Sequence, residues 1–184
     1  LEWISYRSAN RIIGLSPGIV DGIKKCGVRD DRVTMISNGC DLSLFYEVEP
    51  KKVEGVGEDD LLAIFTGAHG IANGIDAALD AAHILKKRGR TDIKFCFIGT
   101  GKLKPDLIKR AQHEKFENCI FIDPVPKTKL AAYLKGADIG MQLLKNVPAF
   151  YYGTSPNKFF DYIATGLPVL NNYPGWLSEM IQDN

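Results

Sequence analysis

The chain has 184 residues, 45% of them hydrophobic, and a formal net charge of +1 at pH 7. This length suits one domain, or one domain with part of another, and the balanced charge gives no indication of a nucleic-acid partner. No stretch reaches the ~20 apolar residues that cross a bilayer, and the four cysteines lack zinc-site spacing. We therefore expect a cytoplasmic chain with free thiols, bound at most to the inner face of a membrane through parts outside this sequence.

The first third of the chain differs in pattern from the rest. We expect a strand at 11–16 (RIIGLS), a helix at 17–25 and a strand at 32–39 (RVTMISNG). From Asp41 to Glu58 the periodicity is lost and Pro, Lys and Gly gather, which is typical of a linker or surface loop. Because the chain starts at Leu1 without Met, we interpret residues 1–47 as the tail of a preceding domain and an inter-domain segment, in an excised part of a longer protein.

From Leu61 onward, short runs rich in Ile, Val and Phe alternate with segments of helical periodicity. Buried strands that alternate with helices are typical of a parallel sheet covered on both faces. The sequence therefore predicts an α/β fold, a Rossmann-like doubly wound parallel sheet in residues 48–184 that is cut short at its C-terminus. We expect strands at 61–65, 93–99, 119–123, 138–144 and 167–172, followed by helices at 75–88, 105–115, 127–135, 156–165 and 176–181.

The loop after the first of these strands is rich in glycine, at Gly67, Gly70 and Gly74. Open α/β sheets bind ligands at the carboxyl ends of their strands, and glycines there let the backbone approach an anion at a helix N-terminus. A plain tight turn is the alternative. His69 lies in this loop and is the one histidine that we consider for ligand contact.

The segment 153–166 (GTSPNKFFDYIATG) is the most informative part of the chain. Thr154 and Ser155 are typical helix caps, and Pro156 suits a first turn. Free backbone N–H groups, the two hydroxyls and Lys158 would then converge on one place suited to a diphosphate. Asp161, one turn later, could accept hydrogen bonds from ribose hydroxyls. A capped helix with solvated Lys and Asp is the alternative.

Together these segments resemble glycosyltransferase family 4, the retaining "group 1" transferases of the GT-B fold. Residues 7–28 and 33–45 resemble its inter-domain segment, which ends in an NGxD…F signature. TGAHGIANGID resembles its glycine-rich donor loop, and FIGTGKLKPDL resembles its G-x-G turn. SPNKFFDYIATGLPVL resembles its donor helix, especially in the branch that builds bacterial surface polysaccharides.

The resemblance implies two Rossmann-like domains, with the C-terminal one holding the donor, and sugar transfer with retention of configuration. It implies no metal and no other cofactor. It also implies that the glycine loop approaches the diphosphate or sugar, that 154–158 hold phosphate oxygens, that Asp161 binds ribose and that 125–126 grip the base. The donor-binding residues that we predict are Gly67, His69, Gly70, Asn73, Gly101, Lys102, Val125, Pro126, Thr154, Ser155, Asn157, Lys158 and Asp161.

Two positions depart from the family pattern. The first glutamate of its E-x7-E motif falls at Gly153, and the basic residue of its donor loop is replaced near Asn73. Positive charge must then come from Lys158, from Lys102 or from the other domain. We expect the catalytic residues and the acceptor site in the missing N-terminal domain, so that this chain alone is inactive.

We therefore expect the donor-binding half of a transferase that moves a hexose-type sugar from a nucleotide sugar to a glycan or lipid-linked acceptor in polysaccharide biosynthesis. A UDP-sugar is favoured, and GDP-mannose, the donor of a mannosyltransferase, comes next. One alternative is a GT-B-like sugar-nucleotide epimerase, which needs acidic and histidine groups that this half does not show. Another is a receiver-like module, which needs an acidic pair where the chain has Thr66 and Gly67, although Asp123 would suit its third-strand aspartate.

Overall fold

The computed structural model describes residues 2–183, which form two compact units. We call Cys40–Lys145 with Lys158–Asn172 the sheet unit, and the described parts of residues 1–39, 146–157 and 173–184 the small unit. These units are defined by contacts, whereas the predicted division into 1–47 and 48–184 is drawn along the sequence and stays a prediction. Each unit is described by itself.

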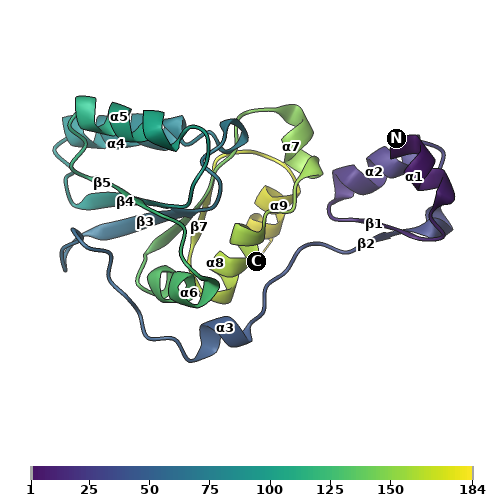
Figure 1. Cartoon of the computed structure of the whole chain (residues 1–184), viewed down its shortest axis with the longest axis horizontal. Coiled ribbons are helices and arrows are strands. Elements are labelled where there is room, and N and C mark those ends of the chain that lie inside the picture. The colour runs from purple at the N-terminus through teal and green to yellow at the C-terminus, as the bar shows by residue number, and fades with distance from the viewer. Residues whose placement is uncertain (1, 184) are drawn as a thin grey trace. The chain divides into compact units, whose positions relative to one another are not determined.

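The sheet unit holds a parallel five-stranded sheet in the order β5-β4-β3-β6-β7. Its strands are β3 (Leu61–Thr66), β4 (Ile93–Ile98), β5 (Cys119–Ile122), β6 (Ile139–Gln142) and β7 (Val169–Asn171). Two helices cover one face, α4 (Asp76–Lys87) and α5 (Lys104–His113), and the other face carries α6 (Lys127–Lys135) and α8 (Asn157–Ala164) (Figure 1). This confirms the predicted α/β class and the doubly wound parallel sheet.

Burial on both faces of the sheet explains why the strand sequences are largely apolar. In β3, Ala63 and Phe65 belong to the core cluster that includes α4 and α5 residues, while Leu62 and Ile64 belong to the cluster that includes α6 and α8 residues. Successive side chains of a strand point to opposite faces, so a strand covered on both sides is apolar at most of its positions. Cys96 is buried in the second cluster, as expected for a structural thiol.

The segment 41–58, predicted as a linker or surface loop, is largely irregular and exposed and packs on the sheet unit. It contains a short helix, α3 (Ser43–Tyr46), and its Phe45 and Val53 side chains are only 2% and 1% exposed. The backbone N–H of Lys51 donates to the carbonyl of Ala132 in α6, at 2.9 Å. The segment is therefore a surface loop with one short helix, held in place by a few isolated apolar side chains that show no periodic pattern.

The small unit contains a two-stranded parallel sheet, β1 (Ile12–Gly14) and β2 (Val33–Met35), both shorter than predicted. The helix predicted at 17–25 is confirmed as α2 (Pro17–Lys25), whose first turn is capped by the Ser16 hydroxyl. The helix α7 (Pro148–Gly153), with a proline in its first turn, occupies a region predicted to be loop. The remaining elements are α1 (Glu2–Ser8), the 3-10 turn η1 (Asp30–Arg32) and α9 (Trp176–Gln182).

Candidate functional site

The carboxyl ends of β3, β4 and β5 lie at one edge of the sheet, where their loops interlock through the backbone. The N–H of Gly67 donates to the carbonyl of Ile98 at 3.0 Å, and that of His69 donates to Thr100 at 2.9 Å. A Cβ on Gly99 would lie 1.9 Å from the carbonyl oxygen of Gly67, and one on Gly101 would lie 2.6 Å from that of His69. The G-x-G turn is therefore required for one loop to pack on the other.

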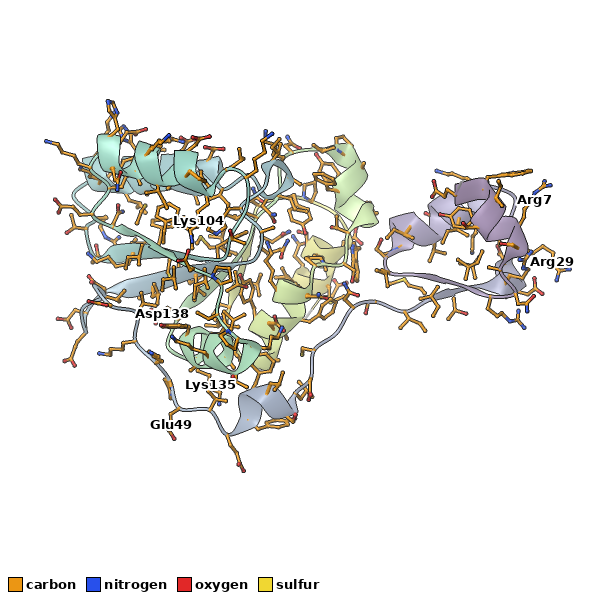
Figure 2. All side chains as sticks on the ribbon, viewed as in Figure 1. Arg7, Arg29, Glu49, Lys104, Lys135 and Asp138 are labelled. Carbon is orange, nitrogen blue, oxygen red and sulfur yellow. The ribbon has the colours of Figure 1, made fainter. Side chains whose placement is uncertain are left out.

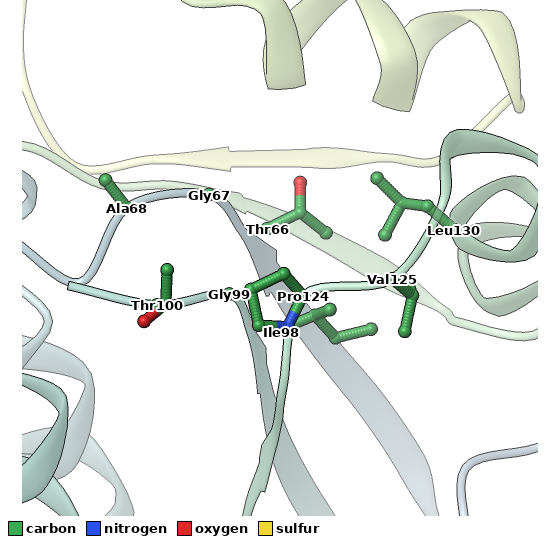
Figure 3. A pocket seen from close by; sticks show the side chains of 9 residues that line it. All are labelled: Thr66, Gly67, Ala68, Ile98, Gly99, Thr100, Pro124, Val125 and Leu130. Atoms are coloured by element: carbon green, nitrogen blue, oxygen red, sulfur yellow. The ribbon is translucent and has the colours of Figure 1, made fainter.

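A pocket of about 330 Å³ opens beside these loops (Figure 3). It is lined mainly by backbone and apolar side chains, so it can take a flat or weakly polar group and leaves charged contacts to its rim. Val125 is part of the lining, as expected for a base contact, whereas Pro126 is the residue before α6 and is not. The lining residues are Thr66, Gly67, Ala68, Ile98, Gly99, Thr100, Pro124, Val125 and Leu130.

The helix α8 is anchored to the sheet by the buried side chain of Tyr162. Its hydroxyl accepts a hydrogen bond from the backbone N–H of Thr66 at 3.1 Å and donates to the carbonyl of Met141 at 3.3 Å. Gly140 leaves room for the ring, because a Cβ there would come within 2.5 Å of it. This anchor fixes where the charged residues of α8 can reach.

Lys158, in the first turn of α8, extends to the glycine loop after β3. Its ammonium donates to Asn73 Oδ1 at 2.9 Å and lies 3.9 Å from the centre of the Phe65 ring. A Cβ on Gly67 would lie 3.6 Å from Lys158 Cε. Burial lowers the pKa of Lys158 to about 7, and no carboxylate within residues 2–183 forms an ion pair with it. The Lys158 side chain is half-buried, and a cation withdrawn from water without a counter-ion is costly, so the site favours an incoming anion.

Asp161, one turn further along α8, faces the start of α6. Its Oδ2 accepts a hydrogen bond from Lys127 Nζ at 2.5 Å, and its side chain is only 4% exposed. The other carboxylate oxygen, Oδ1, is buried and has no hydrogen-bond partner among the described residues. Buried carboxylate oxygens are normally satisfied, so this one is available to a donor such as a hydroxyl group.

The structure corrects the prediction that the hydroxyls of Thr154 and Ser155 cap the next helix, while their convergence with Lys158 stays a prediction. These residues belong to the small unit, where the Thr154 hydroxyl donates to the carbonyl of Phe150 at 3.0 Å. The Ser155 hydroxyl accepts from the backbone N–H of Asn38 at 3.0 Å. The intervening helix α7 redirects this stretch, and α8 begins only at Asn157, whose side chain is exposed.

His69 is also placed differently from the prediction, because its imidazole points into the core and not into the pocket. The side chain is fully buried, with its ring centre 6.0 Å from that of Phe65 and 6.3 Å from that of Phe121. Neither ring nitrogen has a hydrogen-bond partner among the described residues. Burial, followed by the nearby charges of Lys104 and Lys158, lowers the pKa of His69 to about 4, so the ring is neutral.

Lys104 was missed by the sequence analysis, which pointed to Lys102 instead. Lys102 is exposed, whereas Lys104 is buried and labelled in Figure 2. Its ammonium donates to the carbonyls of Gly99 and Ile122, at 2.8 and 3.0 Å, and to Asp123 Oδ1 at 2.6 Å. A lysine in the first turn of a helix opposes the helix dipole, and that local conflict was the available signal. Lys104 ties the ends of β4 and β5 together beside the pocket.

The alternative of a receiver-like module needs acidic residues at the end of β3, where the structure has the buried Thr66. Asp123, its third-strand candidate, is paired with Lys104, and the hydrogen bond from Lys104 lowers the pKa of the Asp123 carboxyl. Within residues 2–183, no group of three or more His, Cys, Asp or Glu side chains could hold a metal ion. No helix in the described part of the chain is both long and apolar enough to span a membrane.

Comparisons with known proteins agree with this architecture. A family model described as glycosyl transferases group 1 matches residues 48–184. The chain is similar to the structure of WaaG, described as a glycosyltransferase involved in lipopolysaccharide biosynthesis, with 16% identity, a TM-score of 0.73, and coverage of 93% of this chain and 46% of that one. A search of curated protein sequences gave no match.

Two further solved structures share the fold. HepE from Anabaena, in complex with UDP, has 12% identity and a TM-score of 0.70, over 98% of this chain and 55% of that one. Sucrose-phosphate synthase from Thermosynechococcus elongatus has 16% identity and a TM-score of 0.73, over 97% of this chain and 44% of that one. The chain therefore spans about half the length of these proteins, and the expected Rossmann-like domain of the GT-B fold is confirmed.

Proposed function

Because the chain belongs to the family of group 1 glycosyl transferases, we propose that it is the donor-binding part of a retaining enzyme of glycosyltransferase family 4. The donor is a nucleotide sugar that carries a hexose, with a UDP-sugar preferred and GDP-mannose as the second choice. The acceptor is a glycan or a lipid-linked glycan of polysaccharide biosynthesis. HepE is solved in complex with UDP, which supports the choice of a UDP-sugar. WaaG is described as acting in lipopolysaccharide biosynthesis, which supports the choice of a glycan or lipid-linked acceptor.

The observation that carries the proposal is the unpaired ammonium of Lys158 beside the glycine loop. Its neighbours are an aromatic ring and a neutral amide, which hold a cation in place without neutralising it. A diphosphate would supply the missing negative charge, and its attraction to the ammonium is strong at a site of low dielectric. In this proposal the loop at Gly67 approaches the phosphates from the side that Lys158 does not occupy.

Two features of the sheet unit support the proposed places of the base and the ribose. The base would enter the largely apolar pocket beside Val125, and the ribose would donate to the free Oδ1 of Asp161. The phosphates would be neutralised by Lys158 without a metal ion. The proposed roles of Thr154, Ser155 and Asn157 rest on the family resemblance alone.

Ligand binding to the 184-residue chain tests this proposal. UDP should bind more tightly than GDP or ADP in ligand-observed NMR or calorimetry. Lys158→Met keeps an unbranched side chain but removes the charge, so UDP binding should weaken by about tenfold or more, while uridine, which lacks phosphates, should bind as before. Lys109→Met, on the exposed face of α5, is the matched control. The proposal fails when no nucleotide binds, or when Lys158→Met binds UDP like the parent chain.

A further inference from the structure

We propose that Asn73 is a positioning residue for Lys158: its side-chain amide holds the ammonium beside the glycine loop without neutralising it, ready for a diphosphate. This inference rests on the proposed function, and it assigns Asn73 a role other than direct contact with the donor. The two side chains come from α8 and from the 3-10 turn η2 (Ile71–Asn73), and they are 85 positions apart in the sequence.

The amide of Asn73 is fixed at both ends. Its Nδ2 donates to the carbonyl of Ala68 at 2.8 Å, which leaves Oδ1 directed at Lys158 Nζ at 2.9 Å. The turn that carries it is also fixed, because the N–H of Asn73 donates to the carbonyl of Gly70 at 3.1 Å. Gly74 follows with a φ of +56°, and a Cβ there would lie 3.1 Å from the backbone nitrogen of Lys145. The turn therefore cannot shift without breaking several backbone contacts.

The charge of the site depends on residue 73 being neutral. The groups that surround the Lys158 ammonium are the Phe65 ring, the Asn73 amide and, further away, the neutral imidazole of His69. An amide oxygen accepts one hydrogen bond from the ammonium and leaves its charge available. A carboxylate in the same place would pair with Lys158 and repel a diphosphate. Asparagine therefore orients the cation but does not compete with an anionic ligand.

Two substitutions of Asn73 separate orientation from charge. Asn73→Ala removes the acceptor and should weaken UDP binding by about tenfold, since hydrogen bonds to charged groups are among the stronger ones. Asn73→Asp keeps the shape and adds a charge, so UDP binding near pH 7 should weaken at least as much. Gln112→Glu adds the same charge on an exposed part of α5 and is the matched control. Uridine should bind all these chains equally.

The pH dependence distinguishes positioning from a merely structural role. UDP affinity of the parent chain should decline as Lys158 loses its proton above about pH 7. In Asn73→Ala the decline should begin at lower pH, because the charged form has lost its acceptor. In Asn73→Asp it should begin at higher pH, because the carboxylate favours the ammonium. A general loosening of the loop would not move the two profiles in opposite directions.

A ligand-free measurement keeps the inference separate from the proposed function. The titration of Lys158 can be followed by NMR of 13Cε-labelled lysine, assigned by comparison with Lys158→Met. Its midpoint should fall in Asn73→Ala and rise in Asn73→Asp. Unchanged midpoints, or unchanged UDP affinity in Asn73→Ala, would overturn the role of Asn73 while leaving the donor site intact. If none of UDP, GDP and ADP binds to the parent chain, the proposed function is overturned instead, and the titration would still decide whether Asn73 controls Lys158.

Discussion

At the scale of single residues, Asp161 and His69 are both buried polar side chains with unpartnered atoms, but their surroundings differ. The carboxylate of Asp161 has one oxygen paired with Lys127 and one buried oxygen without a partner among the described residues. The imidazole of His69 lies among aromatic rings of the core. We expect the carboxylate oxygen to accept from a ligand hydroxyl, as proposed for ribose, whereas nitrogens inside an apolar core indicate only a cost to stability.

Asp161→Asn should therefore weaken UDP binding by about tenfold or more, because a charged acceptor for ribose hydroxyls is lost. The loss should be smaller for 2′-deoxy-UDP, which already lacks one hydroxyl. The free energy of unfolding should fall by about 1–2 kcal/mol, since the ammonium of Lys127 loses the negative charge of its partner but is exposed enough to turn to solvent. Calorimetry with both nucleotides and urea unfolding measure these effects. An equal loss of affinity for both nucleotides would show that Asp161 does not bind the 2′-hydroxyl of the ribose.

His69 should make the folded chain sensitive to mild acid. Its pKa is lowered from 6.5 to about 4 on folding, so the unfolded chain binds a proton that the folded chain does not. The free energy of unfolding should consequently be highest above pH 6.5 and fall as the pH drops towards 4, by at most about 1.4 kcal/mol per pH unit from this one group.

His69→Leu removes the two unpartnered nitrogens and should abolish that part of the acid sensitivity. Urea unfolding at several pH values between 4.5 and 7.5 compares the two chains. UDP binding should remain within about threefold of the parent value, since the imidazole does not line the pocket. Loss of binding in a folded His69→Leu chain would show that the ring reaches the donor after all.

At the scale of elements, the site depends on the way in which the β3 and β4 loops pack on one another. Gly99→Ala should destabilise the chain by about 3 kcal/mol or more, because its Cβ would collide with the carbonyl of Gly67 and its φ of +148° strains any other residue. Gly70→Ala, in the neighbouring loop, has open space around its Cβ and should change stability by less than about 0.5 kcal/mol. Denaturant unfolding of both variants checks this contrast, and similar stabilities would contradict the close packing of the loops.

At the scale of the whole molecule, charge neutralisation should need no metal ion. Among residues 2–183, no three or more His, Cys, Asp or Glu side chains gather where they could hold a metal ion, and Lys158 offers a fixed cation. UDP binding should therefore be unchanged within about twofold by EDTA and by added Mg²⁺. Calorimetric titration in both conditions measures this. Loss of binding after chelation would mean that a metal bridges the phosphates and that Lys158 is not the main counter-charge.

Local patterns were enough to predict most elements of the fold. The strands from β3 to β7 are continuous apolar runs, and the helices between them carry apolar residues at helical spacing, so each element is recognisable by itself. Helix α2 was predicted at its observed bounds because Ser16 and Pro17 mark its start. Helix α7 was overlooked because its six residues are too few to show periodicity.

The sequence by itself therefore determined the parallel α/β sheet and the loops at the carboxyl ends of its strands, while ligand binding at that edge stays a prediction. Only the tertiary structure decided which of the predicted site residues can act together. It turned the hydroxyls of Thr154 and Ser155 to partners in the small unit, buried His69, and joined Lys158 to Asn73. The physical reason is that an element forms from neighbours within a few positions, whereas the partner of a polar side chain is set by packing between segments that lie far apart in the chain.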